Sequence, residues 1–323
     1  MLSFLGFPGL VKTNHLVEIM TANKFIEPDS DQLAALRTSI LDDMFKDFNQ
    51  ARKRWIRKLL EPLAFFPIHR FTRLMLSLDN TISQEGFRRA LHDLAAYFVN
   101  DIGVLGDENI PKEGPLLVVS NHPGTVDSAA IGAKLPRDDL QIIATDFPLL
   151  QRLPYASQHL IFVDQHAPMN LSGPRSTINH LKAGGSVLIF PSGRVEPDPA
   201  IMPDAIDKIL NWSPSIEFFL RKVPQTQVVV TIVSGVLSPI FLNNPINHLL
   251  QGVRDPLAIA EVSQIITQMI LKKRFRMNLN ISFALPQTVD DLRQDYGSIY
   301  QAVIEKANQL MSDHLAHYPP VVK

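Results

Sequence analysis

The hydrophobic pattern of the chain changes near residue 105. Up to that point apolar residues recur at intervals of three and four, which is typical of amphipathic helices. Residues 29–31 can cap a first helix, a second is predicted over residues 44–60, and a third opens at Ser83. No clear strand alternation is visible there, so the sequence predicts an N-terminal helical subdomain over residues 1–105.

From residue 106 onward, short apolar runs alternate with segments of helical periodicity. This alternation predicts an α/β domain over residues 106–323, built on a mainly parallel mixed sheet flanked by helices. A single long amphipathic helix is predicted over residues 289–315. The expected strands cover residues 116–119, 140–144, 160–163, 187–190, 228–233 and 278–283.

The first of these strands ends in the polar sequence SNHPGTVD, residues 120–127. His122 is therefore expected at the carboxyl end of a strand, where open α/β sheets bind their ligands. Asp127 begins the next helix and can fold back onto the imidazole. A carboxylate on one ring nitrogen orients the ring and leaves the other nitrogen free to act as a base. A purely structural His–Asp hydrogen bond would give the same pattern.

The same spacing occurs again at His159 and Asp164. Here the residues between them form a continuous apolar run, which predicts a strand. Residues an odd number apart in a strand point to opposite faces. We therefore expect no contact between His159 and Asp164.

Composition narrows the classes of function. The 323 residues carry a net charge of −1, which gives no support for a nucleic-acid partner. The absence of cysteine excludes disulfides, thiolate metal sites and a thiol nucleophile, and fits a reducing compartment. No signal peptide or apolar stretch of membrane-spanning length is visible, so the expected location is the cytoplasm.

Residues 52–60 mix five basic residues with Trp55 and aliphatic side chains. A basic amphipathic helix with a Trp can make peripheral contact with an anionic membrane. A packed helix with a solvated basic face has the same pattern.

A second candidate site follows the strand expected at residues 187–190, in the sequence FPSGR (residues 190–194). Gly193 allows close approach of a ligand to the backbone. Arg194 can bind a phosphate or carboxylate in a bidentate manner. Taken alone, this sequence also fits an ordinary surface turn.

The order of three blocks carries more information than any one of them. Asn-His-x4-Asp, then FVDQH (residues 162–166), then FPSGR resembles the glycerolipid acyltransferase superfamily over roughly residues 115–240. That superfamily includes glycerol-3-phosphate and lysophosphatidate acyltransferases. The third block, a following PDP and the helical N-terminal part look most like the soluble plastid-type glycerol-3-phosphate acyltransferases.

The resemblance implies a direct acyl transfer in phospholipid biosynthesis. His122 would be the general base and Asp127 its orienting partner. The acyl donor would be acyl-CoA or an acyl carrier protein thioester, used as a co-substrate with no bound cofactor or metal. The acceptor would be glycerol 3-phosphate, a lysophospholipid or a similar hydroxyl compound. Backbone N–H groups at residues 123–125 are candidate donors to the oxyanion that forms.

The resemblance also implies a substrate-binding set in which Arg194 holds the acceptor phosphate. Ser192 and Gly193 belong to the same block, and His166 matches a basic position after the second block. Arg175, at the start of the adjacent helix, is a further candidate for the phosphate.

Three departures from the family pattern weaken this phosphate site. Gln165 and Ser192 stand where membrane-bound members have Arg and Glu, and Glu196 stands where plastid-type enzymes have a second Arg. An acceptor that carries no phosphate ester therefore stays a possibility. Two other functions also stay possible: a catalytically silent acyl- or membrane-binding protein of the same fold, and a thioester hydrolase. The absence of Gly-x-Ser-x-Gly disfavours a Ser-based α/β-hydrolase.

Overall fold

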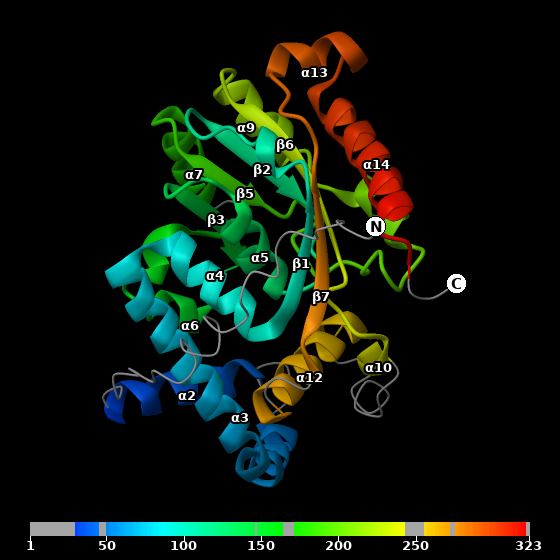
Figure 1. Cartoon of the computed structure of the whole chain (residues 1–323). Coiled ribbons are helices and arrows are strands. Elements are labelled where there is room, and N and C mark those ends of the chain that lie inside the picture. Colours follow the sequence, from blue (N-terminus) through cyan, green and yellow to red (C-terminus); the bar gives the residue numbers. More distant parts are fainter. Residues whose placement is uncertain are drawn as a thin grey trace, which may run out of the picture.

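The computed structural model describes residues 30–44, 50–145, 147–163, 171–242, 255–271 and 275–320 (Figure 1). A seven-stranded sheet runs through the middle of the molecule, in the order β1-β7-β6-β2-β5-β3-β4. The β6–β7 pair is antiparallel and every other neighbouring pair is parallel. The strands are β1 (Val99–Leu105), β2 (Leu116–Ser120), β3 (Leu140–Thr145), β4 (Leu160–Val163), β5 (Ser186–Ile189), β6 (Gln227–Ser234) and β7 (Met277–Phe283).

Helices cover both faces of the sheet (Figure 1). Their bounds are α2 (Ser30–Met44), α3 (Gln50–Glu85), α4 (Phe87–Phe98), α5 (Val126–Lys134), α6 (Pro148–Gln151), α7 (Ser172–Lys182), α8 (Ala205–Lys208), α9 (Ser215–Lys222), α10 (Pro239–Leu242), α12 (Pro256–Leu271), α13 (Val289–Tyr296) and α14 (Ile299–His317).

The central strand β2 shows why the apolar runs have no alternation. Successive side chains of a strand point to opposite faces, so a strand covered on both faces must be apolar throughout. Leu116 and Val118 pack into the core formed with α4 and α5. Leu117 and Val119 pack into a second core formed with α9 and α14.

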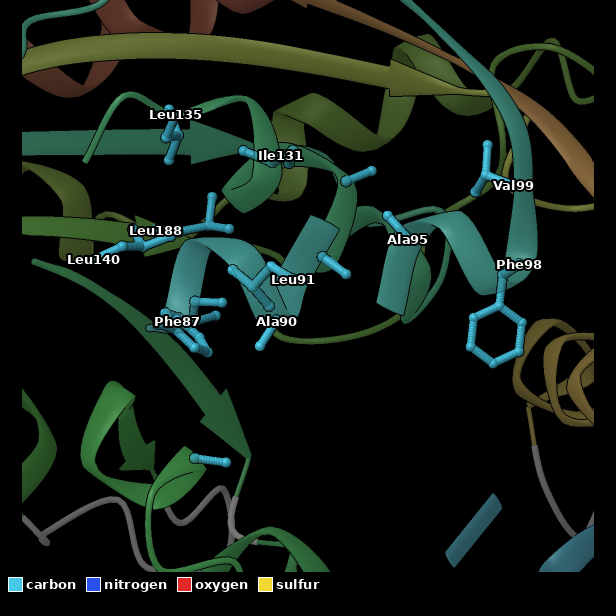
Figure 2. Packing of buried hydrophobic residues seen from close by; sticks show 14 of the residues in the cluster. Phe87, Ala90, Leu91, Ala95, Phe98, Val99, Ile131, Leu135, Leu140 and Leu188 are labelled. Carbon is cyan, nitrogen blue, oxygen red and sulfur yellow. The ribbon is translucent and has the colours of Figure 1, made fainter. Parts of the chain in front are cut away.

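Helix α4 builds the first of these cores (Figure 2). Leu91, one of its buried side chains, packs directly over Gly132 of α5. A Cβ at position 132 would collide with Leu91, so the glycine permits the two helices to approach closely. Phe87 and Leu91 also form part of a cavity wall described below.

The α/β fold and all six expected strands are confirmed, with ends that differ by at most one residue. The prediction of helix up to residue 105 is wrong at its end, where β1 pairs in parallel with β7. In this edge strand Val99 is buried, Asn100 and Asp101 are exposed and the other positions are half-buried, so its sequence lacks a continuous apolar run.

The helical predictions need two corrections. The helix expected over residues 44–60 is the first part of α3, which begins at Gln50 and continues to Glu85, and the helix expected to open at Ser83 is α4, which begins at Phe87. The expected helix over residues 289–315 is two helices, because Gly297 adopts a left-handed conformation with φ of 70° and Ser298 caps α14.

The predicted amphipathic segment, residues 52–60, belongs to α3, and its side chains lie outside the described residues. Within the described parts of the chain, no helix has both the length and the apolar character needed to cross a membrane.

His314 of α14 connects this helix to two strands from a fully buried position. Its Nε2 lies 2.7 Å from Ser234 Oγ of β6, and its Nδ1 lies 2.7 Å from Ser282 Oγ of β7. Burial, with a smaller contribution from His317, lowers the pKa of His314 from 6.5 to about 4. The imidazole is therefore neutral in the folded protein at neutral pH.

We expect this histidine to make the fold sensitive to acid. Its stabilising contribution is complete above pH 6.5 and is lost as the pH falls from 6.5 through 4, because the unfolded chain then takes up a proton that the folded chain excludes. The loss amounts to roughly 3 kcal/mol. Urea unfolding between pH 4 and 7 measures it. His314→Asn should have a flatter dependence on pH, and an unchanged slope would contradict this account.

Candidate active site

The sheet places the two predicted blocks side by side. Strands β2 and β5 are parallel neighbours, with Val119 opposite Ile189, so both end at the same edge of the sheet. His122 follows β2 at that edge, and the FPSGR turn (residues 190–194) follows β5. The Phe190 ring stacks on the His122 ring at 4.3 Å between centroids.

Asn121 fixes the chain just before His122. Its side-chain NH2 donates to the Val233 carbonyl oxygen at 2.9 Å, and its Oδ1 accepts the Val233 N–H at 2.8 Å. The amide side chain thus continues the hydrogen-bonding pattern of β2 against β6 after the strand itself has ended. This explains why a buried Asn precedes the histidine.

The expected contact between His122 and Asp127 is present. His122 Nδ1 lies 2.9 Å from Asp127 Oδ2 and 3.1 Å from Oδ1. The aspartate is fully buried, whereas 22% of the His122 side chain is exposed. Asp127 also accepts the Gly124 N–H, which closes the turn between strand and helix. The carboxylate therefore engages Nδ1, and Nε2 is the ring nitrogen left for a substrate.

The pKa of His122 is raised from 6.5 to about 9. Burial by itself lowers this pKa, but the charge and hydrogen bond of Asp127 outweigh it, with further contributions from Glu261 and Glu196. The imidazole is thus a stronger base than a free histidine and holds its proton at neutral pH. Its neutral form, which can accept a proton, increases as the pH rises toward 9.

Glu196 occupies a different place from the one that the family pattern suggested. The side chain is buried, and its carboxylate accepts the His122 N–H at 2.9 Å and the Trp212 Nε1–H at 3.1 Å. Its own N–H donates to the His122 carbonyl oxygen at 2.7 Å. Burial raises the pKa of Glu196 to about 7, against the effect of these hydrogen bonds. Glu196 therefore holds the His122 backbone and does not line the cavity.

The FPSGR turn exposes its arginine. Gly193 has φ of 64° and its N–H donates to the Phe190 carbonyl oxygen at 3.0 Å. The Ser192 hydroxyl donates to the Arg194 carbonyl oxygen at 2.9 Å. Behind the turn, buried Asp198 accepts backbone N–H groups from the segment after β6. These contacts fix the turn, and the exposed Arg194 side chain lies at the cavity wall.

A cavity of about 1040 Å³ joins the two blocks. Its wall includes His122, Ser192, Gly193 and Arg194. Among the described lining residues, Arg194 is the one Lys or Arg. Much of the apolar part of the wall comes from α3, α4, β3, β4 and the segment around α6, through Phe71, Met75, Leu78, Phe87, Leu91, Leu94, Phe98, Ile142, Ala144, Phe147, Leu149, Leu150, Ala156 and Leu160.

Other predicted residues fall elsewhere. His166 and Gln165 lie outside the described residues, as does Asp164, so the expectation about the second His-x4-Asp pair stays a prediction. Arg175 is exposed on the first turn of α7 and is not among the residues that line the cavity. The role proposed for Arg175 therefore gains no support from the described geometry.

The N–H groups expected to bind an oxyanion are already engaged. The Gly124 N–H donates to Asp127, and the Thr125 N–H donates to Glu261 of α12. Sequence reasoning did not find Glu261. A signal was available, because Glu261 is the one charged residue of α12.

Residues 101–230 match the family model described as Acyltransferase, from within β1 to within β6. This segment contains His122, Asp127 and the FPSGR turn, and the match indicates an acyltransferase enzyme.

A search of curated proteins gave no match. Among solved structures, the chain is similar to the 1-acyl-sn-glycerophosphate (LPA) acyltransferase PlsC from Thermotoga maritima. The sequence identity is 15% and the TM-score 0.42, over 87% of this chain and 97% of that one.

Glu196 stands where the plastid-type enzymes have a second Arg, and its side chain is buried. We therefore expect that an arginine is not tolerated at this position. Glu196→Arg should destabilise the protein by about 3 kcal/mol or more, because it removes a buried acceptor and introduces an unpaired buried cation. Thermal unfolding measures this loss. Ser192→Arg adds the same charge to the same turn at a less buried position and should cost far less. Wild-type stability for Glu196→Arg would contradict the assignment.

Proposed function

We propose that the protein transfers a fatty acyl group from an acyl thioester to a hydroxyl group of a glycerolipid-like acceptor. The observation that carries this proposal is the His122–Asp127 pair, set in a cavity with a long apolar wall and one arginine. A base, an apolar binding surface and an anion-binding side chain are the features that such a transfer needs. The donor is acyl-CoA or an acyl carrier protein thioester.

The chemistry follows from the geometry of the pair. His122 Nε2 accepts the proton of the acceptor hydroxyl as the oxygen attacks the thioester carbonyl carbon. The tetrahedral intermediate collapses with cleavage of the C–S bond, and the imidazolium then donates this proton to the leaving thiolate. The products are an ester and a free thiol. Asp127 stabilises the imidazolium and holds the tautomer with Nε2 free.

Arg194 is the group that we assign to an anionic acceptor such as glycerol 3-phosphate or a lysophospholipid. A guanidinium forms two parallel hydrogen bonds to a phosphate, which orients it as well as binding it. Since Glu196 faces inward, the second cationic position of the plastid-type pattern makes no contribution here. Ser192 and Gly193 place the arginine at the cavity wall.

The test of this function is acyl transfer itself. Thiol release from acyl-CoA is measured with a panel of hydroxyl acceptors. Mass spectrometry of the products then distinguishes ester formation from release of free fatty acid. We expect ester formation in the wild type. His122→Gln should lower kcat by roughly 10²- to 10⁴-fold.

His159→Gln is the matched control, because it removes the other histidine that has an aspartate five positions later. It should keep most of the activity. Full activity in His122→Gln would refute the proposed base, and free fatty acid as the main product would favour the hydrolase instead.

The apolar wall should also limit the length of the acyl chain. Ala144 of β3 is only partly buried and lines the cavity, so Ala144→Phe adds volume there without overpacking the core. We expect kcat/KM to fall more for long-chain than for short-chain acyl-CoA. The ratio of kcat/KM for long-chain to short-chain acyl-CoA, measured in the same variant, corrects for any general loss of activity. Equal losses for both chain lengths would mean that the acyl chain binds elsewhere.

A further inference from the structure

Glu261 of α12 is a buried carboxylate in an unusual setting. Only 8% of the residue is exposed, and it is the one charged residue in its helix. Burying a carboxylate costs several kcal/mol unless hydrogen bonds and charges compensate for the lost water. An apolar residue would pack α12 at less cost, so the charge at this position calls for a specific partner.

The partner is the turn that carries His122 and Asp127. Glu261 Oε1 accepts the Thr125 N–H, at the start of α5. It also lies against Gly124, where an added Cβ would come within 3.3 Å of Oε1. The first N–H groups of a helix carry partial positive charge, which favours a carboxylate at this end. Glu261 thus binds the turn midway between the candidate base and its aspartate.

Attachment of α12 to the core does not depend on this contact. Gln264, one turn further along the same face, accepts the Ser238 N–H at 2.8 Å and donates to the Val236 carbonyl oxygen at 2.8 Å. These bonds join α12 to the segment that leaves β6. Because Gln264 already supplies an anchor, a structural role alone does not explain the ionisable group at position 261.

We propose that Glu261 is a positioning residue for His122, which fixes the turn through Thr125 and adds negative charge beside the imidazole. This inference rests on the proposed function. It places part of the site on a helix that lies beyond residues 101–230, the segment that matches the acyltransferase family.

Several charged groups act on the His122 ring besides Glu261. Asp127 approaches from α5, and Glu196 from the turn after β5. Arg194 and Asp255 are the other charged residues among the described residues of the cavity wall. Glu261 and Glu196 both raise the pKa of His122, after the larger contribution of Asp127.

The experiment compares Glu261→Gln with Gln264→Leu. Glu261→Gln keeps the size and the acceptor oxygen but removes the charge, whereas Gln264→Leu removes the anchor of α12 and leaves the charge. NMR titration of the His122 ring, identified by its loss in His122→Gln, reports the pKa without any substrate. The pH profile of kcat/KM reports the same group during turnover.

We expect the His122 titration and the acidic limb of the profile to move to lower pH in Glu261→Gln, with kcat lowered roughly tenfold. Asp127→Asn should move the titration further in the same direction. Gln264→Leu should lower the thermal stability and leave the titration in place. An unchanged titration in Glu261→Gln, or an equal shift in Gln264→Leu, overturns the proposal.

The two proposals can fail separately. If His122→Gln keeps its transferase activity while Glu261→Gln still shifts the titration, the proposed base is wrong and the influence of Glu261 on the ring stands. If His122→Gln is inactive and Glu261→Gln moves neither readout, only the assignment of Glu261 is wrong.

Discussion

Two hydrogen bonds between the His122 backbone and Glu196 join two loops that the sheet only brings near each other. Parallel pairing of β2 and β5 places the ends of both strands at one edge, but it does not fix the loops beyond them. One buried glutamate supplies that link by accepting the His122 N–H while its own N–H donates to the His122 carbonyl oxygen. The cavity wall on either side of the histidine depends on this link.

Three carboxylates surround the same short turn, and each takes a different part of it. Asp127 binds the imidazole, Glu196 the backbone of the histidine, and Glu261 the N–H that precedes α5. Burial raises the pKa of both glutamates, while their charges help to raise that of His122. The protonation of His122 therefore depends on all three carboxylates around the turn.

The fold was largely predictable because each buried strand corresponds to a continuous apolar run in the sequence. Six strands follow from that rule, and β1 does not because the exposed Asn100 and Asp101 interrupt its apolar residues. The His122–Asp127 contact was predictable for another reason, since a turn joins the two residues within a few positions. The roles of Glu196 and Glu261 were not, because their partners are fixed by tertiary packing. The lone charge in α12 marks Glu261, but it does not reveal the backbone N–H that this carboxylate binds.

The pairing of β1 with β7 has a consequence for how the protein is made. Val99 pairs with Met277, and parallel strands so distant in sequence are slow to meet because a long loop must close first. During synthesis, the segment that matches the acyltransferase family emerges before both α12 and β7 exist. A nascent chain that reaches only the end of β6, at Ser234, has an unpaired β6 edge and lacks Glu261. The growing chain therefore acquires the complete environment of its base only after α12 and β7 have been synthesised.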